Sequence, residues 1–151
     1  MSISSRRNIS CDIVGPSQMS AAKDRQPIVL VVDDHEDTRQ MSLIVLQHQG
    51  FDAVAAEGAA AGFAAACSNQ PDVIVTDLAM PDGDGWDFVR QLSTDTRTKG
   101  IPVIVLTACA TESVRQRARE ERCAGFFFKP CAPDVLAGEL RRLIAARVQS
   151  V

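Results

Sequence analysis

The sequence predicts an α/β fold, a doubly wound (βα)5 domain in which five parallel strands alternate with five helices. Short runs rich in Val, Ile and Phe recur along the chain, and segments of helical length separate them. The four clearest runs begin at Ile28, Val73, Val103 and Phe126, and a polar residue follows each one directly. Runs this short and this apolar are typical of strands buried on both faces of a parallel sheet.

The first half of the domain contains three strands and two helices. In order, we predict strand 28–33, helix 37–49, strand 51–55, helix 57–68 and strand 72–77. Met41 and Ile44, with Val45 and His48, mark one face of the first helix, and Gly50 ends it. The second helix is rich in alanine, and its one large apolar side chain is that of Phe63.

The second half alternates in the same way. In order, we predict loop 80–85, a helix from Trp86, strand 101–107, a helix to about 123, strand 126–128 and a helix over about 133–147. Thr111 is the expected N-cap of the fourth helix, and Pro133 lies in the first turn of the last. The last helix should face the core with its apolar residues at 135, 136, 140, 143 and 144.

Residues 1–26 are polar and rich in serine, which predicts a disordered tail before a domain spanning 27–147 and a short tail at 148–151. Translation could start at Met1 or at Met19. The tail lacks the apolar block of a signal peptide, and no apolar stretch approaches the roughly 18 residues of a membrane span. We therefore expect a cytoplasmic protein with no membrane partner.

The composition narrows the function classes. The net charge of −3 disfavours direct binding of nucleic acid, which usually needs a basic face. The five cysteines form no C-x-x-C pair, so we expect reduced thiols rather than disulfides or a zinc site. Arginines at 115, 117, 119 and 122 alternate with glutamates, which indicates a solvated helix face of mixed charge.

Polar residues follow four of the predicted strands. Asp33 ends the first strand and Asp34 follows it, Asp77 ends the third, Thr107 ends the fourth, and Lys129 follows the fifth. Because the carboxyl ends of parallel strands share one rim, we expect these five side chains to converge. Three carboxylates, a hydroxyl and an ammonium predict a site that binds a divalent metal and accepts a phosphoryl group.

The acidic residues suit Mg²⁺, which prefers oxygen ligands and keeps several waters. We expect Asp34 and Asp77 as direct ligands, Asp33 acting through a water, and the backbone carbonyl of Ala79 as a further ligand. Three carboxylates repel one another unless a cation lies between them. Alone, the pair Asp33 and Asp34 would also suit the start of a helix, but Asp77 at the next matching strand end favours the metal site.

Asp77 is the predicted nucleophile, because a carboxylate can attack phosphorus and form an aspartyl phosphate. Lys129 would supply a second positive charge, and Thr107 would donate a hydrogen bond to a phosphoryl oxygen. Pro130 restricts the backbone of its predecessor, which makes the Lys129–Pro130 bond a candidate for the cis form.

An ordered set of motifs resembles the signature of response regulator receiver domains, the CheY-like modules of two-component signalling. The set comprises Asp33-Asp34, Asp77, Met80-Pro81-Asp82-Gly83, Thr107-Ala108 and Lys129-Pro130. The resemblance covers about residues 27–147 and implies a flavodoxin-like sheet with strand order 2-1-3-4-5. It implies phosphorylation of Asp77 from a phosphohistidine donor in a Mg²⁺-dependent reaction.

The resemblance also implies a switch. Thr107 resembles the switch hydroxyl, and Phe126, three residues before Lys129, stands at the aromatic switch position. On phosphorylation the ring of Phe126 would turn inward as Thr107 moves, which would repack the surface of the fourth helix, fifth strand and fifth helix. Plain core packing is the alternative for Phe126, since Phe127 and Phe128 are also apolar.

The implied partners are proteins. The resemblance implies a sensor histidine kinase or a histidine phosphotransfer protein as donor, a downstream protein target, and a homodimer through the switch surface. After residue 147 the sequence has no room for an output domain, so we expect a single-domain regulator and not a turnover enzyme. A receiver cut from a larger regulator or hybrid kinase is the alternative.

Two residues depart from receivers that lose their phosphoryl group fast. Ala79 and Cys109, two residues after Asp77 and Thr107, lack the polar groups that orient the hydrolytic water in the family, so we expect slow autodephosphorylation. Two other interpretations stay open. A Mg²⁺-dependent phosphohydrolase would need a second acid where Ala79 stands, and a receiver-like module could signal without phosphorylation.

Overall fold

The structure, a computed structural model, describes residues 25–80, 83–108 and 111–149. Its main sheet has five parallel strands in the order β3-β2-β4-β7-β8, which confirms the predicted order 2-1-3-4-5. The strands are β2 (Ile28–Val32), β3 (Asp52–Ala56), β4 (Val73–Asp77), β7 (Val103–Thr107) and β8 (Gly125–Phe128). The helices are α2 (Glu36–His48), α3 (Ala59–Asn69), α4 (Gly85–Thr94), α5 (Glu112–Glu120) and α6 (Pro133–Gln149).

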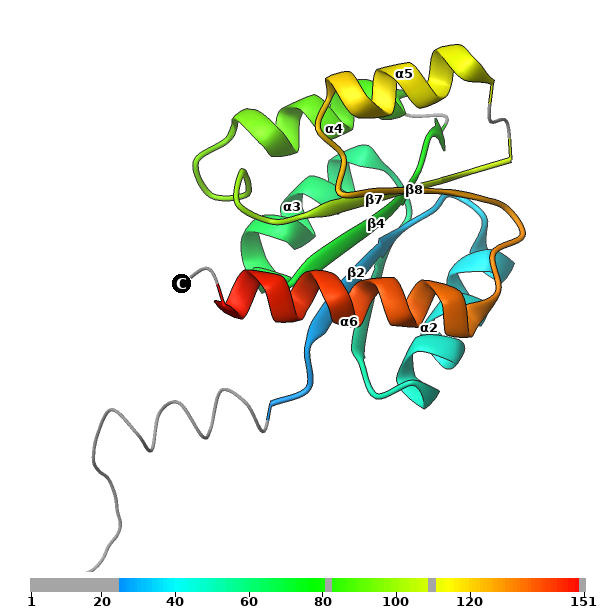
Figure 1. Ribbon diagram of the computed structural model, residues 1–151, viewed down its shortest axis with the longest axis vertical. Helices are drawn as coiled ribbons and strands as arrows, with labels where there is room; N and C mark the ends of the chain where they lie inside the picture. Colours follow the sequence, from blue (N-terminus) through cyan, green and yellow to red (C-terminus); the bar gives the residue numbers. More distant parts are fainter. Residues whose placement is uncertain (1–24, 81–82, 109–110, 150–151) are drawn as a thin grey trace, which may run out of the picture.

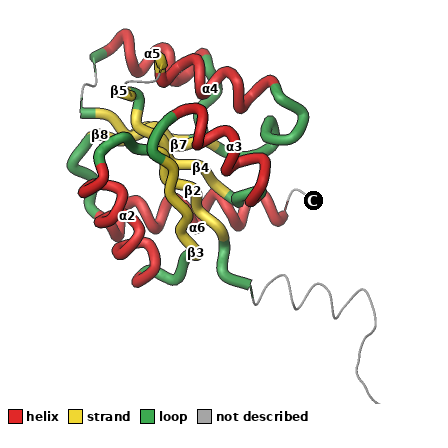
Figure 2. The backbone as a smooth tube through the Cα atoms, turned by 180° about the vertical axis from the view of Figure 1, so that it is seen from behind, coloured by secondary structure: helices red, strands yellow, loops and turns green. Residues whose placement is uncertain are grey.

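The helices cover both faces of the sheet. Figure 1 shows α3, α4 and α5 on one face and α2 and α6 on the other, and the view from behind in Figure 2 shows the same layers. Each face has its own apolar core, because successive side chains of a strand point to opposite faces. In β2, Leu30 and Val32 pack toward α3 and α4, whereas Val29 and Val31 pack toward α2 and α6.

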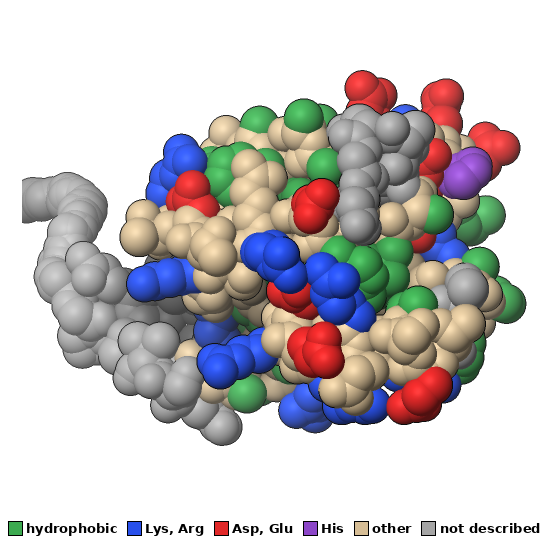
Figure 3. All heavy atoms as spheres, turned by 90° about the horizontal axis from the view of Figure 1, so that it is seen from above, with side chains coloured by type: hydrophobic (Ala, Val, Ile, Leu, Met, Phe, Trp, Pro, Cys, Tyr) green, Lys and Arg blue, Asp and Glu red, His purple; other side chains and the backbone are tan. Residues whose placement is uncertain are grey.

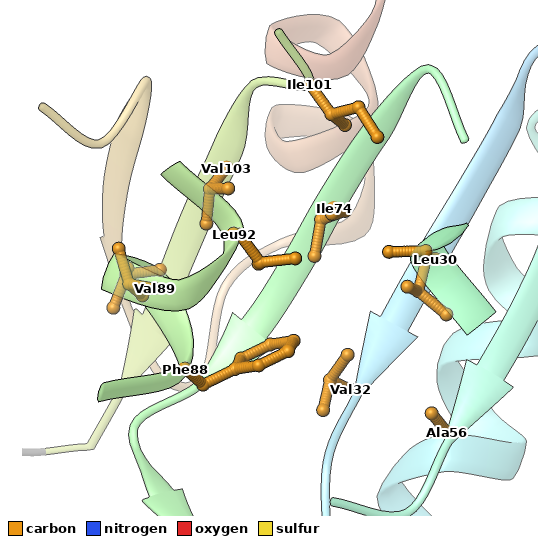
Figure 4. Packing of buried hydrophobic residues seen from close by; sticks show 11 residues of the cluster. Leu30, Val32, Ala56, Ile74, Phe88, Val89, Leu92, Ile101 and Val103 are labelled. Carbon is orange, nitrogen blue, oxygen red and sulfur yellow. The ribbon is translucent and has the colours of Figure 1, made fainter. Parts of the chain in front are cut away.

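The core on the α3–α4 side is filled around the ring of Phe88. Figure 4 shows this ring reaching from α4 between the side chains of β2 and β4, close to Val32. The chain leaves room for the ring with a glycine: a Cβ on Gly62 of α3 would stand 2.9 Å from the tip of the Phe88 ring. Gly138 of α6 has no such neighbour within 4 Å.

The predicted inner faces of two helices are partly wrong. Met41 and Ile44 of α2 are 61% and 52% exposed, and the buried residue of that helix is Leu46. Val135 of α6 is 55% exposed, while Leu140, also predicted to face inward, is fully buried. Apolar residues at 41, 43, 44, 45 and 46 occupy more than one face of α2, so their periodicity did not define a single inner face.

Several local predictions hold. The Thr111 hydroxyl caps α5 by accepting a hydrogen bond from the Val114 N–H at 3.3 Å. Gly50 follows α2 in the left-handed region, at φ +94°. Helix α5 ends at Glu120 rather than near residue 123, and the chain turns there with Arg122 at φ +59°. An unpredicted two-stranded sheet, β5 (Ala79–Met80) paired with β6 (Gly83–Asp84), overlaps the predicted loop 80–85.

The arginine-rich face of α5 is more ordered than its mixed charge suggests. Figure 3 shows basic and acidic side chains interspersed over the α4–α5 side of the molecule. Glu121 accepts hydrogen bonds from Arg90 of α4 and Arg117 of α5, and Arg117 also lies over the ring of Trp86. These two arginines hold the pKa of Glu121 below its ordinary value. The ion pairs therefore tie α4 to α5.

Candidate functional site

The polar side chains that follow the strands meet at one rim of the main sheet. Asp77 is the last residue of β4, and Thr107 is the last residue of β7. Asp33 directly follows β2, and Lys129 directly follows β8. These strands are parallel neighbours, so the four residues come together although the chain separates them widely.

The carboxylates form a compact cluster at this rim. One ligand atom from each of Asp33, Asp34, His35 and Asp77 lies within 4.8 Å of the others. The side chains of Asp33 and Asp77 are 4% and 8% exposed, that of Asp34 is 23% exposed, and that of His35 is 70% exposed. Backbone N–H groups fix two of the acids: His35 donates to Asp33 Oδ1 at 2.9 Å and Ala79 donates to Asp77 Oδ1 at 3.1 Å.

The acidic pair does not serve as the start of a helix. The N-cap of α2 is His35, which makes no side-chain capping hydrogen bond. Asp33 turns toward the rim instead, and its backbone carbonyl accepts a hydrogen bond from Arg39 at 2.9 Å.

Lys129 is the positive charge of the cluster. Its Nζ lies 2.8 Å from Asp33 Oδ2 and 2.9 Å from Asp77 Oδ2. Burial alone would raise the pKa of Asp33, but the hydrogen bonds from Lys129 and from the His35 N–H, with the Lys129 charge, outweigh it and lower the pKa. Burial opposes the charged form of Lys129 as well, yet its hydrogen bonds to Asp33 and Asp77 raise its pKa. The ammonium therefore bridges the carboxyl groups of Asp33 and Asp77.

The donor set fits a divalent cation. Three carboxylates and one ammonium leave a formal charge of −2, which one divalent ion would balance. Asp34 Oδ1 is buried and has no hydrogen-bond partner among the described residues, so one lone pair at the cluster is left for a ligand. Carboxylate oxygens are the ligands that Mg²⁺ prefers. The residues that could hold it are Asp33, Asp34 and Asp77, and Ala79 lies beside Asp77.

Backbone contacts connect the lysine to the hydroxyl. The Lys129 N–H donates to the Thr107 carbonyl at 2.9 Å, and Thr107 itself is buried. The Lys129–Pro130 peptide bond, the predicted candidate, is cis. The structure thus places the hydroxyl of Thr107 and the ammonium of Lys129 on neighbouring strand ends, β7 and β8.

The protein-family model of the response regulator receiver domain matches residues 29–141, three quarters of the chain. The chain belongs to the response regulator receiver family.

The relatives of this receiver domain agree with the assignment. It is 32% identical over 116 residues to the phosphate regulon transcriptional regulatory protein PhoB of Escherichia coli, covering 77% of this chain and 51% of that protein. It is 28% identical to protein PilH of Pseudomonas aeruginosa, covering 78% of this chain and 97% of that protein. The chain thus spans about half the length of the first curated relatives it matches.

Solved receiver structures share its fold. The chemotaxis protein CheY4 of Vibrio cholerae superposes with a TM-score of 0.74 at 29% identity, covering 79% of this chain and 99% of that one. Receiver domains are signalling domains that work with histidine kinases or phosphotransfer proteins. None of the helices in the described part of the chain is long and apolar enough to cross a membrane.

Phe126, the predicted switch residue of the receiver, lies away from the acids on the α5 side of β8. It is half-buried against the core of that side, and Phe128 meets it edge-to-face at 6.2 Å. Arg115 of α5 covers both rings, with its guanidinium carbon 5.4 Å from the Phe126 centroid and 5.1 Å from that of Phe128. Cys109, expected near the site, lies outside the described residues.

Two residues at or near the site escaped sequence reasoning. The place of His35 in the cluster was not predicted, because a single histidine directly after the acidic pair is indistinguishable from an ordinary loop residue in the sequence. Arg115 was predicted to lie on a solvated charged face, because nothing in its spacing from the Phe-Phe-Phe run indicates a contact with those rings. Only the packing of α5 on β8 makes its role visible.

Proposed function

We propose that Asp77 accepts a phosphoryl group from a phosphohistidine donor in a Mg²⁺-dependent reaction. A carboxylate oxygen of Asp77 would attack phosphorus as the bond from phosphorus to the histidine nitrogen breaks, leaving an aspartyl phosphate and a free imidazole. The observation that carries the proposal is the position of the Asp77 carboxylate, which lies between the Lys129 ammonium and two further acids.

The neighbouring residues divide the remaining work. Asp34 and Asp77 would bind the metal directly, Asp33 through a water, and Ala79 through its carbonyl. The metal supplies positive charge to the phosphoryl oxygens, which is the main demand of phosphoryl transfer. Lys129 already bonds Asp77 and would move to a phosphoryl oxygen, while Thr107 would donate to another. These proposed roles are those of the residues at the matching positions of the receiver family.

The signal would leave through the α5–β8–α6 surface. Thr107 stands opposite Phe128 in the β7–β8 pairing, and Phe126 is two residues before Phe128. A shift of Thr107 toward the phosphoryl group would disturb the aromatic pair that Arg115 covers. We propose that the chain acts by protein contacts at this surface, as a single-domain regulator, with a homodimer as one form of that contact.

The phosphodonor would approach from the α2–α6 side of the rim. An apolar groove of about 430 Å³ lies between these helices, lined among others by Met41, Leu136 and Lys129. Because Lys129 also bonds Asp77, a helix of the donor seated in this groove would hold its phosphohistidine next to the nucleophile. Met41→Ala should slow transfer from the cognate kinase and leave phosphorylation by acetyl phosphate unchanged.

Intact-mass spectrometry after incubation with acetyl phosphate and Mg²⁺ tests the proposal. The wild-type chain should gain the mass of one phosphoryl group, and the gain should vanish in Asp77→Asn and with EDTA. Equal labelling of Asp77→Asn would refute the assignment of the phosphoacceptor. Absent labelling together with unchanged Trp86 fluorescence on adding Mg²⁺ would favour a receiver that signals without phosphorylation.

A further inference from the structure

His35 brings a nitrogen donor to the acidic cluster. Its Nδ1 lies 3.2 Å from Asp34 Oδ1 and 3.4 Å from Asp33 Oδ1. The residue is the N-cap of α2, yet its side chain makes no capping hydrogen bond. The imidazole therefore contacts the two acids instead of capping the helix.

The separations suit two ligands of one ion. Neighbouring donors of an octahedral ion with bonds of about 2.1 Å stand about 3 Å apart, close to the 3.2 Å from Nδ1 to Oδ1 of Asp34, the acid proposed as a direct ligand. Asp34 Oδ1 has no hydrogen-bond partner among the described residues, so the short contact with His35 is not a hydrogen bond between them.

We propose that His35 Nδ1 is a protein ligand of the metal site, so that the site prefers a first-row transition dication such as Mn²⁺ or Co²⁺ to Mg²⁺. This inference rests on the proposed metal site and adds to it. Imidazole is a softer ligand than carboxylate and binds transition ions well, whereas Mg²⁺ takes oxygen. A nitrogen beside three carboxylates thus shifts the selectivity of an otherwise oxygen-only site.

Calorimetric titration of the full chain with Co²⁺ and with Mg²⁺ tests this ligand. His35→Ala should weaken Co²⁺ binding by about tenfold or more and change Mg²⁺ binding little, because only the nitrogen ligand is lost. The visible absorption of bound Co²⁺ should change with it. His48→Ala, at the far end of α2, removes the other histidine of the chain and should leave both affinities as in wild type.

The outcomes separate this inference from the proposed function. If His35→Ala keeps the wild-type ratio of Co²⁺ to Mg²⁺ affinity and the same Co²⁺ spectrum, His35 is only an ion-pair partner of the acids and the inference falls. Labelling by acetyl phosphate with Mg²⁺ would then still support the phosphoacceptor. If the wild-type chain binds neither ion, the metal site and this inference fall together.

Discussion

Substituting Lys129 by methionine would keep the length and apolar stem of the side chain and remove its ammonium. Asp33 and Asp77, whose side chains are 4% and 8% exposed, would lose the hydrogen bonds at 2.8 and 2.9 Å that now partner them. The formal charge of the cluster would change from −2 to −3. The variant should therefore be less stable without metal and should bind Mg²⁺ more tightly.

The size of the effect follows from the contacts. At these distances each contact is worth about 6 kcal/mol before desolvation, at the effective dielectric of a protein surface. Desolvation of the three groups offsets most of this, and breaking a fully buried pair costs about 3–5 kcal/mol. Because the Lys129 side chain is 25% exposed, we expect a loss of about 2–4 kcal/mol. That loss corresponds to a Tm lower by about 5–15 °C.

Thermal denaturation with and without Mg²⁺ measures both effects. Mg²⁺ should raise the Tm of Lys129→Met by more than it raises the Tm of wild type, because the variant should bind the ion more tightly. A ligand at about 100 times its Kd adds about 2.7 kcal/mol to the free energy of unfolding. Lys99→Met is the matched control, because Lys99 is exposed and should change stability by less than about 0.5 kcal/mol. A Lys129→Met protein with wild-type stability and wild-type Mg²⁺ affinity would refute the electrostatic argument.

Three other experiments test the packing, the ion pairs and the chemistry. Gly62→Ala should cost about 1–3 kcal/mol in denaturant unfolding, because its Cβ would stand 2.9 Å from the Phe88 ring, whereas Gly138→Ala, in open space, should gain about 0.5–1 kcal/mol; equal effects would contradict this packing. Glu121→Gln should lose stability near neutral pH, and the difference from wild type should fade as the pH falls from 4.5 through the lowered folded-state pKa; a difference independent of pH would exclude the ion pairs as its source. Ala79→Asn should speed the loss of the phosphoryl group, followed by intact mass, and an unchanged decay would show that this position does not limit hydrolysis.

The strands and the rim were predictable from the sequence because both depend on local pattern. Apolar runs, rich in Val and Ile in three strands and in Phe in β8, predicted the strand bounds to within two residues, and the polar residue after each of these four runs could be read directly. Once the strands are parallel, their carboxyl ends share one edge, so the convergence of Asp33, Asp77 and Lys129 follows from topology. Distances between these side chains were beyond the sequence, because they depend on rotamers.

What the sequence could not show depends on tertiary packing. The apolar residues of α2 surround the helix, so only its seat on the sheet shows that Leu46 faces inward and Met41 outward. The strands β5 and β6 have two residues each, too short for any periodicity. Arg115 has the charge of a solvated helix residue, and only the approach of α5 to β8 puts it over two aromatic rings.

The site and the proposed switch surface are joined by adjacent contacts rather than by a long path. The Lys129 ammonium donates a hydrogen bond to the Asp77 carboxylate, and the Lys129 backbone N–H donates one to the Thr107 carbonyl. Thr107 in turn pairs with Phe128, which is 46% exposed and covered by Arg115. A new charge on Asp77 would act on Lys129 and Thr107 together, and both adjoin Phe128 on β8. One strand pairing therefore separates the site from the proposed surface, so the proposed signal would need only a local repacking of β7 against β8.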